Sequence, residues 1–234
     1  DNLNTWSTGV SHVDINADGL LDIYVCKASG YRALKGTNLL YINQGVDANG
    51  IPHFKEDAAK YGLAFSGLST QAAFFDYDLD GDLDLYVCSG GVETTKFSAS
   101  YLDKLSRNDG QGNCPLSKQK LPTSFGYHSS SSIAVADVDH DNDLDIFVGE
   151  RAIPNSYGLP GAGFLLLNDG KGNFYNVDNS EFENLGMITD VAFVDLNNDS
   201  FKDIVVVGEF MGVLVFENKK GVFSKLKNHP LIQT

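Results

Sequence analysis

Four short acidic segments of the chain carry carboxylates at a spacing that suits a metal ion. They read DINADGLLD from Asp14, DYDLDGDLD from Asp76, DVDHDNDLD from Asp137 and DLNNDSFKD from Asp195. Calcium takes about six to eight oxygen ligands, and alternate acidic residues in a tight loop direct several carboxylates at one point. Four copies of one pattern predict four calcium-binding loops, which we call loops 1 to 4 in chain order.

The candidate ligands share their positions in all four loops. Positions 1, 3, 5 and 9 are Asp or Asn, and position 7 varies, as expected for a backbone carbonyl ligand whose side chain points away. The predicted ligands are Asp14, Asn16, Asp18, Leu20 and Asp22 in loop 1; Asp76, Asp78, Asp80, Asp82 and Asp84 in loop 2; Asp137, Asp139, Asp141, Asp143 and Asp145 in loop 3; and Asp195, Asn197, Asp199, Phe201 and Asp203 in loop 4.

Position 6 of each loop needs a sharp reversal of the chain, which a residue with positive φ makes most easily. Gly19 and Gly81 adopt such a conformation without steric cost, and Asn142 tolerates it. Ser200 fits least well. Loop 4 is therefore the weakest of the four predicted sites.

The residues that flank the loops distinguish strands from helices. An EF-hand needs a bidentate Glu at position 12 and helices on both sides. Position 12 is Val25, Val87, Val148 and Val206 here, and the flanks are rich in β-branched and aromatic residues. The loops are thus predicted to join two strands. Asp-rich turns also form without a metal, but four copies at one spacing favour the metal interpretation.

The loops begin 62, 61 and 58 residues apart, and this near-constant period indicates a repeat architecture. Each period contains four short β-like runs. We therefore predict an all-β chain, a single repeat domain built as a β-propeller of four-stranded antiparallel blades over residues 7–66, 67–128, 129–186 and 187–234. The segment CPLSKQKLP, with two prolines, is at best an edge strand. Asn43, Asn108, Asn168 and Asn218 each precede a glycine closely, which favours hairpin turns over additional metal sites.

The acidity of the chain is local to the loops. Its net charge is −14, and positions 1, 3, 5 and 9 hold 14 Asp, so the other 17 acidic residues balance the 17 Lys and Arg. Nucleic acid is an unsuitable partner because no basic stripe is present. No apolar run is long enough to span a membrane. The chain starts at Asp1 without Met, which suggests a processed product or a piece of a longer protein. Cys26, Cys88 and Cys114 are predicted to be buried or free thiols.

The DxDxDGxxD loops between apolar strands, followed by NLLYINQG or LLLNDGKGNF, resemble the FG-GAP (VCBS-type) repeat. The segments STQAAFFDYDLDGDLDLYV, DLDIFVGERAIPNSYG and GMITDVAFVDLNNDSFKDIVVVGEF look most like bacterial relatives of cartilage acidic protein. The resemblance implies calcium in the loops and a propeller of the seven-bladed type that forms integrin α heads. Loop 4 departs from the pattern because it lacks the glycine. Four blades either close a small ring or form an arc of a larger propeller.

The connections between second and third strands should lie on the face opposite the loops, where loops on a rigid scaffold commonly bind partners. They carry Tyr31, Arg32, Lys35, Glu93, Lys96, Phe97, Tyr101, Arg151 and Tyr157. We expect a non-catalytic scaffold, with no catalytic residue and no organic cofactor, that binds protein or glycan and also further blades of the same parent protein. We expect it to be extracellular or at the cell surface, either secreted or associated with an outer membrane.

Two other functions remain open from the sequence. A polysaccharide-active, lyase-type propeller would need groups such as His128, Tyr127 and Arg151 to converge in a deep pocket of the opposite face. A structural subunit of a surface assembly would present large apolar surfaces at the two ends of the arc.

Overall fold

The computed structural model describes residues 5–95, 97–118, 121–122 and 127–227, and they form four antiparallel sheets that follow one another along the chain. The strands and the two short 3-10 helices are β1 (Trp6–Val13), β2 (Asp22–Ala28), β3 (Leu39–Val46), β4 (Pro52–Glu56), β5 (Ser69–Phe75), β6 (Asp84–Ser89), η1 (Ala99–Tyr101), β7 (Lys104–Ser106), β8 (Ser129–Ala136), β9 (Asp145–Ala152), β10 (Gly163–Leu167), β11 (Tyr175–Val177), η2 (Ser180–Phe182), β12 (Met187–Val194), β13 (Asp203–Glu209), β14 (Leu214–Lys219) and β15 (Val222–Lys225). This all-β chain confirms the predicted fold class.

Each sheet is one blade, with its strands hydrogen-bonded in chain order. Blades 1, 3 and 4 have four strands: β1 to β4, β8 to β11 and β12 to β15. Among the residues that the structure describes, blade 2 has three strands, β5 to β7, and a single bridge between Ser106 and Leu116 stands at the place of a fourth. The prolines of the segment predicted to form only an edge strand explain this, since proline cannot donate to a ladder.

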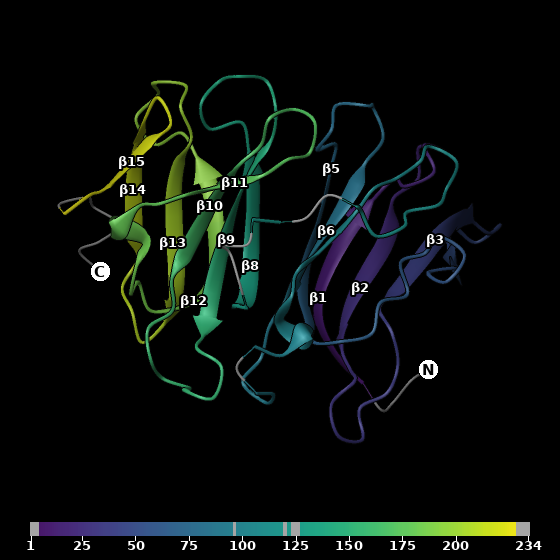
Figure 1. Cartoon of the computed structure of the whole chain (residues 1–234). Helices are drawn as coiled ribbons and strands as arrows, with labels where there is room; N and C mark the ends of the chain where they lie inside the picture. Colours follow the sequence, from purple (N-terminus) through teal and green to yellow (C-terminus); the bar gives the residue numbers. More distant parts are fainter. Residues whose placement is uncertain (1–4, 96, 119–120, 123–126, 228–234) are drawn as a thin grey trace.

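The blades stand side by side as an arc, with blade 1 and blade 4 at its two ends (Figure 1). Strand contacts join blade 1 to blade 2 through β1 and β5, blade 2 to blade 3 through β5 and β8, and blade 3 to blade 4 through β8 and β12. The first strand of every blade thus lies against the first strand of the next.

The hydrophobic core is divided among the three junctions between blades. One cluster joins Tyr24 and Leu40 of blade 1 to Leu85 of blade 2. The second and third clusters join blade 2 to blade 3 and blade 3 to blade 4 in the same way. Each blade therefore buries its apolar faces only against its neighbours, as expected for a repeat protein. Cys26, Cys88 and Cys114 are free and buried in these clusters or beside them, which confirms the prediction for the thiols.

The first strand of each blade contains a bulge, and in blades 1 to 3 this bulge directs a hydroxyl group toward the next blade. The register with the second strand shifts between Ser69 and Ala72 in β5, and at the equivalent places in the other three blades. Within the bulges, Thr8, Thr70 and Ser131 donate hydrogen bonds to backbone carbonyl oxygens of the following first strand, at 2.7, 2.8 and 2.7 Å. A bulge re-aims a side chain, so these bulges serve the contact between blades.

We expect that replacing Thr70 by Val lowers the melting temperature, because valine keeps the shape but removes the hydroxyl that bonds the carbonyl of Ser130. One such bond is worth about 1 kcal/mol, which corresponds to about 2–4 °C for a chain of this size. Differential scanning calorimetry measures the change.

Thr189→Val is the matched control. Thr189 occupies the same place in blade 4, and its hydroxyl lies 3.5 Å from the carbonyl oxygen of Val207 in its own blade. Its replacement should change the melting temperature by less than about 2 °C. Equal losses in the two variants would contradict a role of the hydroxyl in joining blades.

Candidate metal centres

The four acidic loops all lie on one face of the arc. Each joins the first strand of a blade to the second, and the first strands of neighbouring blades run in the same direction, since Thr8 bonds Ser69 and Ser11 bonds Ala72. The connections between second and third strands therefore lie on the other face. We call these the loop face and the opposite face.

The Asp at position 1 shapes each loop by accepting backbone N–H groups from positions 5 and 6 or their neighbours. In loop 2, the amides of Asp80 and Gly81 donate to the two oxygens of Asp76 at 3.2 and 2.9 Å. Asp14, Asp137 and Asp195 accept equivalent bonds in the other loops. These bonds cap the turn and orient the first carboxylate.

Position 6 has positive φ in every loop, as predicted: +83° at Gly19, +96° at Gly81, +73° at Asn142 and +77° at Ser200. Ser200 thus adopts the conformation despite its side chain, and its amide is held by Asp195 at 2.9 Å. Position 4 also has positive φ, at Ala17, Leu79, His140 and Asn198. This second reversal is not predictable from the residue types at position 4, because they share no preference for it.

The Asp at position 9 is buried in every loop and fixes the loop to the third strand. Asp22, Asp84, Asp145 and Asp203 are at most 2% exposed. In each, one oxygen accepts the amide of position 2 and the other accepts the amide of the Asn that ends the third strand, as in the 2.7 Å bond from Asn108 to Asp84. These carboxylates hold each loop to the third strand, and they also face the other acidic side chains of the loop.

The Asn residues at the ends of the third strands form the predicted turns, and two of them also link blades. Gly45, Gly110, Gly170 and Gly221, which follow them, all have positive φ. The side-chain amide of Asn168 donates to the carbonyl of Tyr77 in the preceding blade at 2.7 Å, and that of Asn218 donates to Val138 at 2.8 Å. This second role does not follow from the turn pattern.

Two of the four loops bring three carboxylates together. One ligand oxygen from each of Asp76, Asp78 and Asp84 lies within 4.8 Å of the others, and Asp137, Asp139 and Asp145 do the same. Among the described residues, loops 1 and 4 give no such cluster of acidic side chains, because Asn replaces Asp at position 3. There Asn16 and Asn197 donate side-chain bonds of 2.9 Å to Asp18 and Asp199.

Loops 2 and 3 contain buried carboxylate oxygens that lack a hydrogen-bond partner. These are Oδ1 of Asp78, Asp139 and Asp143. Buried polar atoms are normally paired, so three orphan oxygens within acidic loops fit a cation. Asp143, at position 7, is only 4% exposed. Its side chain therefore does not point away as predicted. It packs inward beside the turn that follows the third strand, where a Cβ added to Gly170 would lie 3.4 Å from Asp143 Oδ2.

Burial makes ionisation of these groups costly when no cation is present. It raises the pKa of Asp84 and of Asp145 to about 7, although the hydrogen bonds from the amides of Asn108 and Asn168 act in the opposite direction and lower it. Burial, followed by the charge of Asp141, raises the pKa of Asp143 to about 6. A bound cation would remove this cost by favouring the charged forms.

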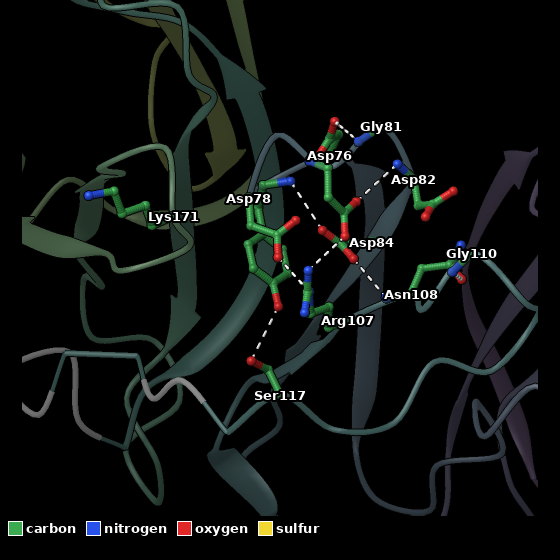
Figure 2. A network of polar contacts seen from close by, with 12 residues as sticks. Asp76, Asp78, Gly81, Asp82, Asp84, Arg107, Asn108, Gly110, Ser117 and Lys171 are labelled. Carbon is green, nitrogen blue, oxygen red and sulfur yellow. Dashed lines mark hydrogen bonds and ion pairs between the residues drawn. The ribbon is translucent and has the colours of Figure 1, made fainter.

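Loop 2 differs from the others because a guanidinium group lies on it. Arg107 Nε is 2.5 Å from Asp78 Oδ2, and Arg107 Nη2 is 2.8 Å from Asp80 Oδ2 (Figure 2). The residue at this place, directly before the third-strand Asn, is Ile42, Leu167 and Glu217 in the other blades. Sequence reasoning missed Arg107 because the two carboxylates precede it by more than 25 residues.

His140 in loop 3 faces loop 4 instead of a metal centre. Its ring stacks on Phe201 with a centroid distance of 4.1 Å, and its Nε2 is 3.1 Å from the carbonyl oxygen of Ser200. The two loops are thus packed together through this pair. All candidate ligand atoms in the four loops are oxygens.

On the opposite face, most of the predicted partner-binding residues are exposed. Arg32 lies over the ring of Tyr31 at 5.1 Å, Phe97 packs edge-on against Tyr127, and Arg151 pairs with Glu209. Tyr101 is an exception, because it is 1% exposed and its hydroxyl bonds the backbone of Thr94. It therefore supports its loop from beneath. Lys96 lies outside the described residues.

The sheets and the loops define the class of protein. Successive four-stranded antiparallel sheets, side by side and joined by inter-blade contacts, are the blades of a β-propeller. Residues 14–87, from the start of loop 1 to β6 beyond loop 2, match the FG-GAP-like repeat, and this match supports the resemblance to FG-GAP-type repeats. No curated protein matches the chain. None of the helices in the described residues has the length and hydrophobicity to cross a membrane.

We expect that Asn168→Ala destabilises the protein through loss of the bond to Tyr77 in the neighbouring blade. The buried carbonyl would be left without a partner, which costs about 1–3 kcal/mol. Thermal unfolding should show a loss of about 3 °C or more.

Asn43→Ala is the control for this change, since Asn43 makes the same turn in blade 1 and donates to Leu21 of its own blade. Its effect should be clearly smaller. If the two variants lose the same stability, the bond between blades contributes nothing beyond the turn.

Proposed function

We propose that the chain is a calcium-stabilised, non-catalytic β-propeller scaffold that binds protein or glycan partners outside the cell or at the cell surface. The metal acts structurally, by neutralising clustered carboxylates and fixing the hairpins. Where a site forms only in the folded chain, the free energy of metal binding adds to the free energy of folding.

The observation that carries this proposal is the set of three buried, unpartnered carboxylate oxygens in loops 2 and 3. Ligand sets made only of oxygen suit calcium or magnesium and not zinc or copper. Loop ligands drawn from alternate residues give the flexible geometry that calcium accepts, whereas magnesium demands a near-octahedral site. Extracellular calcium modules need a Kd of only about 10⁻⁴ to 10⁻³ M.

The proposed ligands are not equivalent in the four loops. Loop 3 would hold calcium through Asp137, Asp139, Asp141 and Asp145, with the Asp143 side chain as an additional donor. Loop 2 offers the corresponding four Asp but also holds Arg107. In loops 1 and 4, Asn16 and Asn197 supply a neutral oxygen in place of a charged one, so we expect weaker binding there.

The opposite face supports a binding role over catalysis. Its cavity, described below, is lined by Arg151, whereas His128 and Tyr127 are not among the described residues that line it. His128 Nδ1 lies 3.4 Å from Glu150 Oε1, and Tyr127 packs on Phe97. The three groups that a lyase-type site would require therefore face different partners.

The arc also favours further blades as partners. Thr189, in blade 4, keeps the bulge and the hydroxyl that Thr8, Thr70 and Ser131 use to bond the next blade. At the other end of the arc, Trp6 is 65% exposed. We propose that additional blades of the same type pack on both ends, as in a larger propeller.

Calcium should raise the melting temperature of the protein substantially. At about 2 mM calcium and a Kd on the order of 10⁻⁴ M, each filled site adds about 2 kcal/mol. We expect a rise of several degrees over a sample with excess chelator, with two to four ions bound by native mass spectrometry.

Magnesium at the same concentration should raise the melting temperature much less. The double variant Asp139→Asn with Asp143→Asn should bind one calcium ion fewer than the wild type. If calcium causes no shift and no ion is bound, the acidic loops are turns only and the proposal fails.

Arg107→Gln should increase the affinity of loop 2 for calcium, because the guanidinium competes for Asp78 and Asp80. Exposed ion pairs are worth up to about 1 kcal/mol, so the change should be roughly threefold. Calorimetric titration with calcium measures the change in affinity. It is done in the Asp139→Asn, Asp143→Asn double variant, so that binding at loop 3 does not overlap with binding at loop 2.

Arg32→Gln, an exposed arginine on the opposite face, is the control and should leave calcium affinity unchanged. A lower affinity in Arg107→Gln would show instead that Arg107 supports the calcium-bound loop.

A further inference from the structure

A cavity of about 160 Å³ lies on the opposite face at the junction of blades 2 and 3. Blade 2 contributes Thr70 from β5 and residues 90–93 after β6. Blade 3 contributes residues 129–131 from β8, together with Arg151, Ala152 and Tyr157. The cavity is smaller than the roughly 300 Å³ or more of pockets for drug-sized ligands, so it suits one small ring.

The floor of the cavity is fixed by bonds between the blades. The hydroxyl of Ser129 accepts the amide of Gly91 at 2.8 Å, and Thr70 bonds the carbonyl of Ser130. A Cβ on Gly90 would lie 2.2 Å from the oxygen of Ser130. Glycine is required there because the two backbones approach each other.

Two polar residues that line the cavity, Arg151 and Tyr157, are held in place by hydrogen bonds to Glu209. Arg151 Nη2 donates to Glu209 Oε1 at 2.6 Å, and the Tyr157 hydroxyl donates to Glu209 Oε2 at 3.1 Å. These two bonds hold the pKa of Glu209 below its usual range, so it stays ionised. Arg151 and Tyr157 are thereby held in place before a ligand arrives, which reduces the entropy lost on binding.

The lining of the cavity also includes the carboxylate of Glu93. Its Oε2 accepts the amide of Val92 at 2.7 Å, which positions the carboxylate beside Gly91. A Cβ on Gly91 would lie 2.3 Å from this oxygen. Glu93 is exposed, and its acceptor oxygens and the donor groups of Arg151 both belong to the lining of the cavity.

Two exposed aromatic residues in strained conformations lie in the neighbouring loops of this face. Phe97 has φ of +75° and is 69% exposed, while Phe210, directly after Glu209, has φ of +57° and is 91% exposed. Positive φ is unfavourable for bulky residues and is concentrated at functional sites. Neither residue lines the cavity itself, but both expose apolar surface in loops that adjoin residues of its lining.

The charges at the rim restrict the class of ligand. An anionic group would meet the carboxylate of Glu93, and a cationic group would meet the guanidinium of Arg151. A neutral ring with many hydroxyls accommodates both, since each hydroxyl donates to a carboxylate or accepts from a guanidinium. The ring of Tyr157, which is 60% exposed, offers a flat surface for the C–H face of such a ring.

We propose that this cavity binds one neutral sugar unit of a glycan. Glu93 accepts hydrogen bonds from its hydroxyls, Arg151 donates to its oxygens, and Tyr157 packs against its apolar face. The proposal rests on the non-catalytic binding function proposed above and identifies the ligand of the opposite face.

The test is saturation-transfer NMR on the calcium-loaded protein with glucose, galactose, mannose and N-acetylglucosamine, followed by titration of neutral oligosaccharides. We expect at least one neutral sugar to bind with a Kd on the order of 1 mM. Glu93→Gln and Tyr157→Ala should each weaken binding about tenfold or more. Tyr157→Phe, which keeps the ring, should weaken it less than Tyr157→Ala.

The controls are Glu183→Gln and Tyr175→Ala, two exposed residues of the same types on blade 3 away from the cavity, and they should bind like the wild type. Absence of binding to any neutral sugar, preference for a sulfated sugar or an arginine-containing peptide, or equal binding by Tyr157→Ala would overturn the inference. The calcium-dependent melting temperature of the same samples separates this failure from failure of the proposed scaffold.

Discussion

The burial of a carboxylate at the end of every acidic loop is the constraint on which the rest of this structure depends. Each loop buries its last Asp against the third strand, and this burial raises the pKa of Asp84 and of Asp145 to about 7. Backbone amides compensate part of the cost by donating to these oxygens. The remainder calls for a positive charge, which Arg107 supplies in part in loop 2 and which calcium would supply elsewhere.

The blades are held together at both ends, and this makes the opposite face a rigid platform. At the loop face, Asn168 and Asn218 bond the carbonyls of the preceding blade. Near the opposite face, Thr70 and Ser131 bond the carbonyls of the following blade from within bulges. The apolar clusters fill the space between. A loop anchored on such strands can keep a bulky residue such as Phe210 at positive φ, because the surrounding strands fix its ends.

The sequence was sufficient to predict the features that depend on local pattern. The strands that flank each loop, the weak fourth strand of blade 2 and the positive φ of Gly81 all follow from residue types within about ten positions. Features that depend on contacts between distant segments were missed: the bond from Asn168 to Tyr77, the ion pairs of Arg107 and the burial of Tyr101. The prediction that the side chain of Asp143 points away was wrong for the same reason, since this side chain packs inward. The turn beside which it packs lies more than 20 residues later in the chain.

The separation of the two faces determines how the proposed calcium ions would influence the proposed ligand. The acidic loops and the cavity beside Tyr157 lie at opposite ends of the same strands, so a cation in a loop does not touch a ligand in the cavity. Its effect must pass through the rigidity and stability of the blades. Loops 2 and 3 connect the strands of blades 2 and 3, which also form the cavity, and they contain the carboxylate clusters with unpartnered oxygens. The blades with the strongest requirement for a cation are therefore the two whose junction the proposed ligand would occupy.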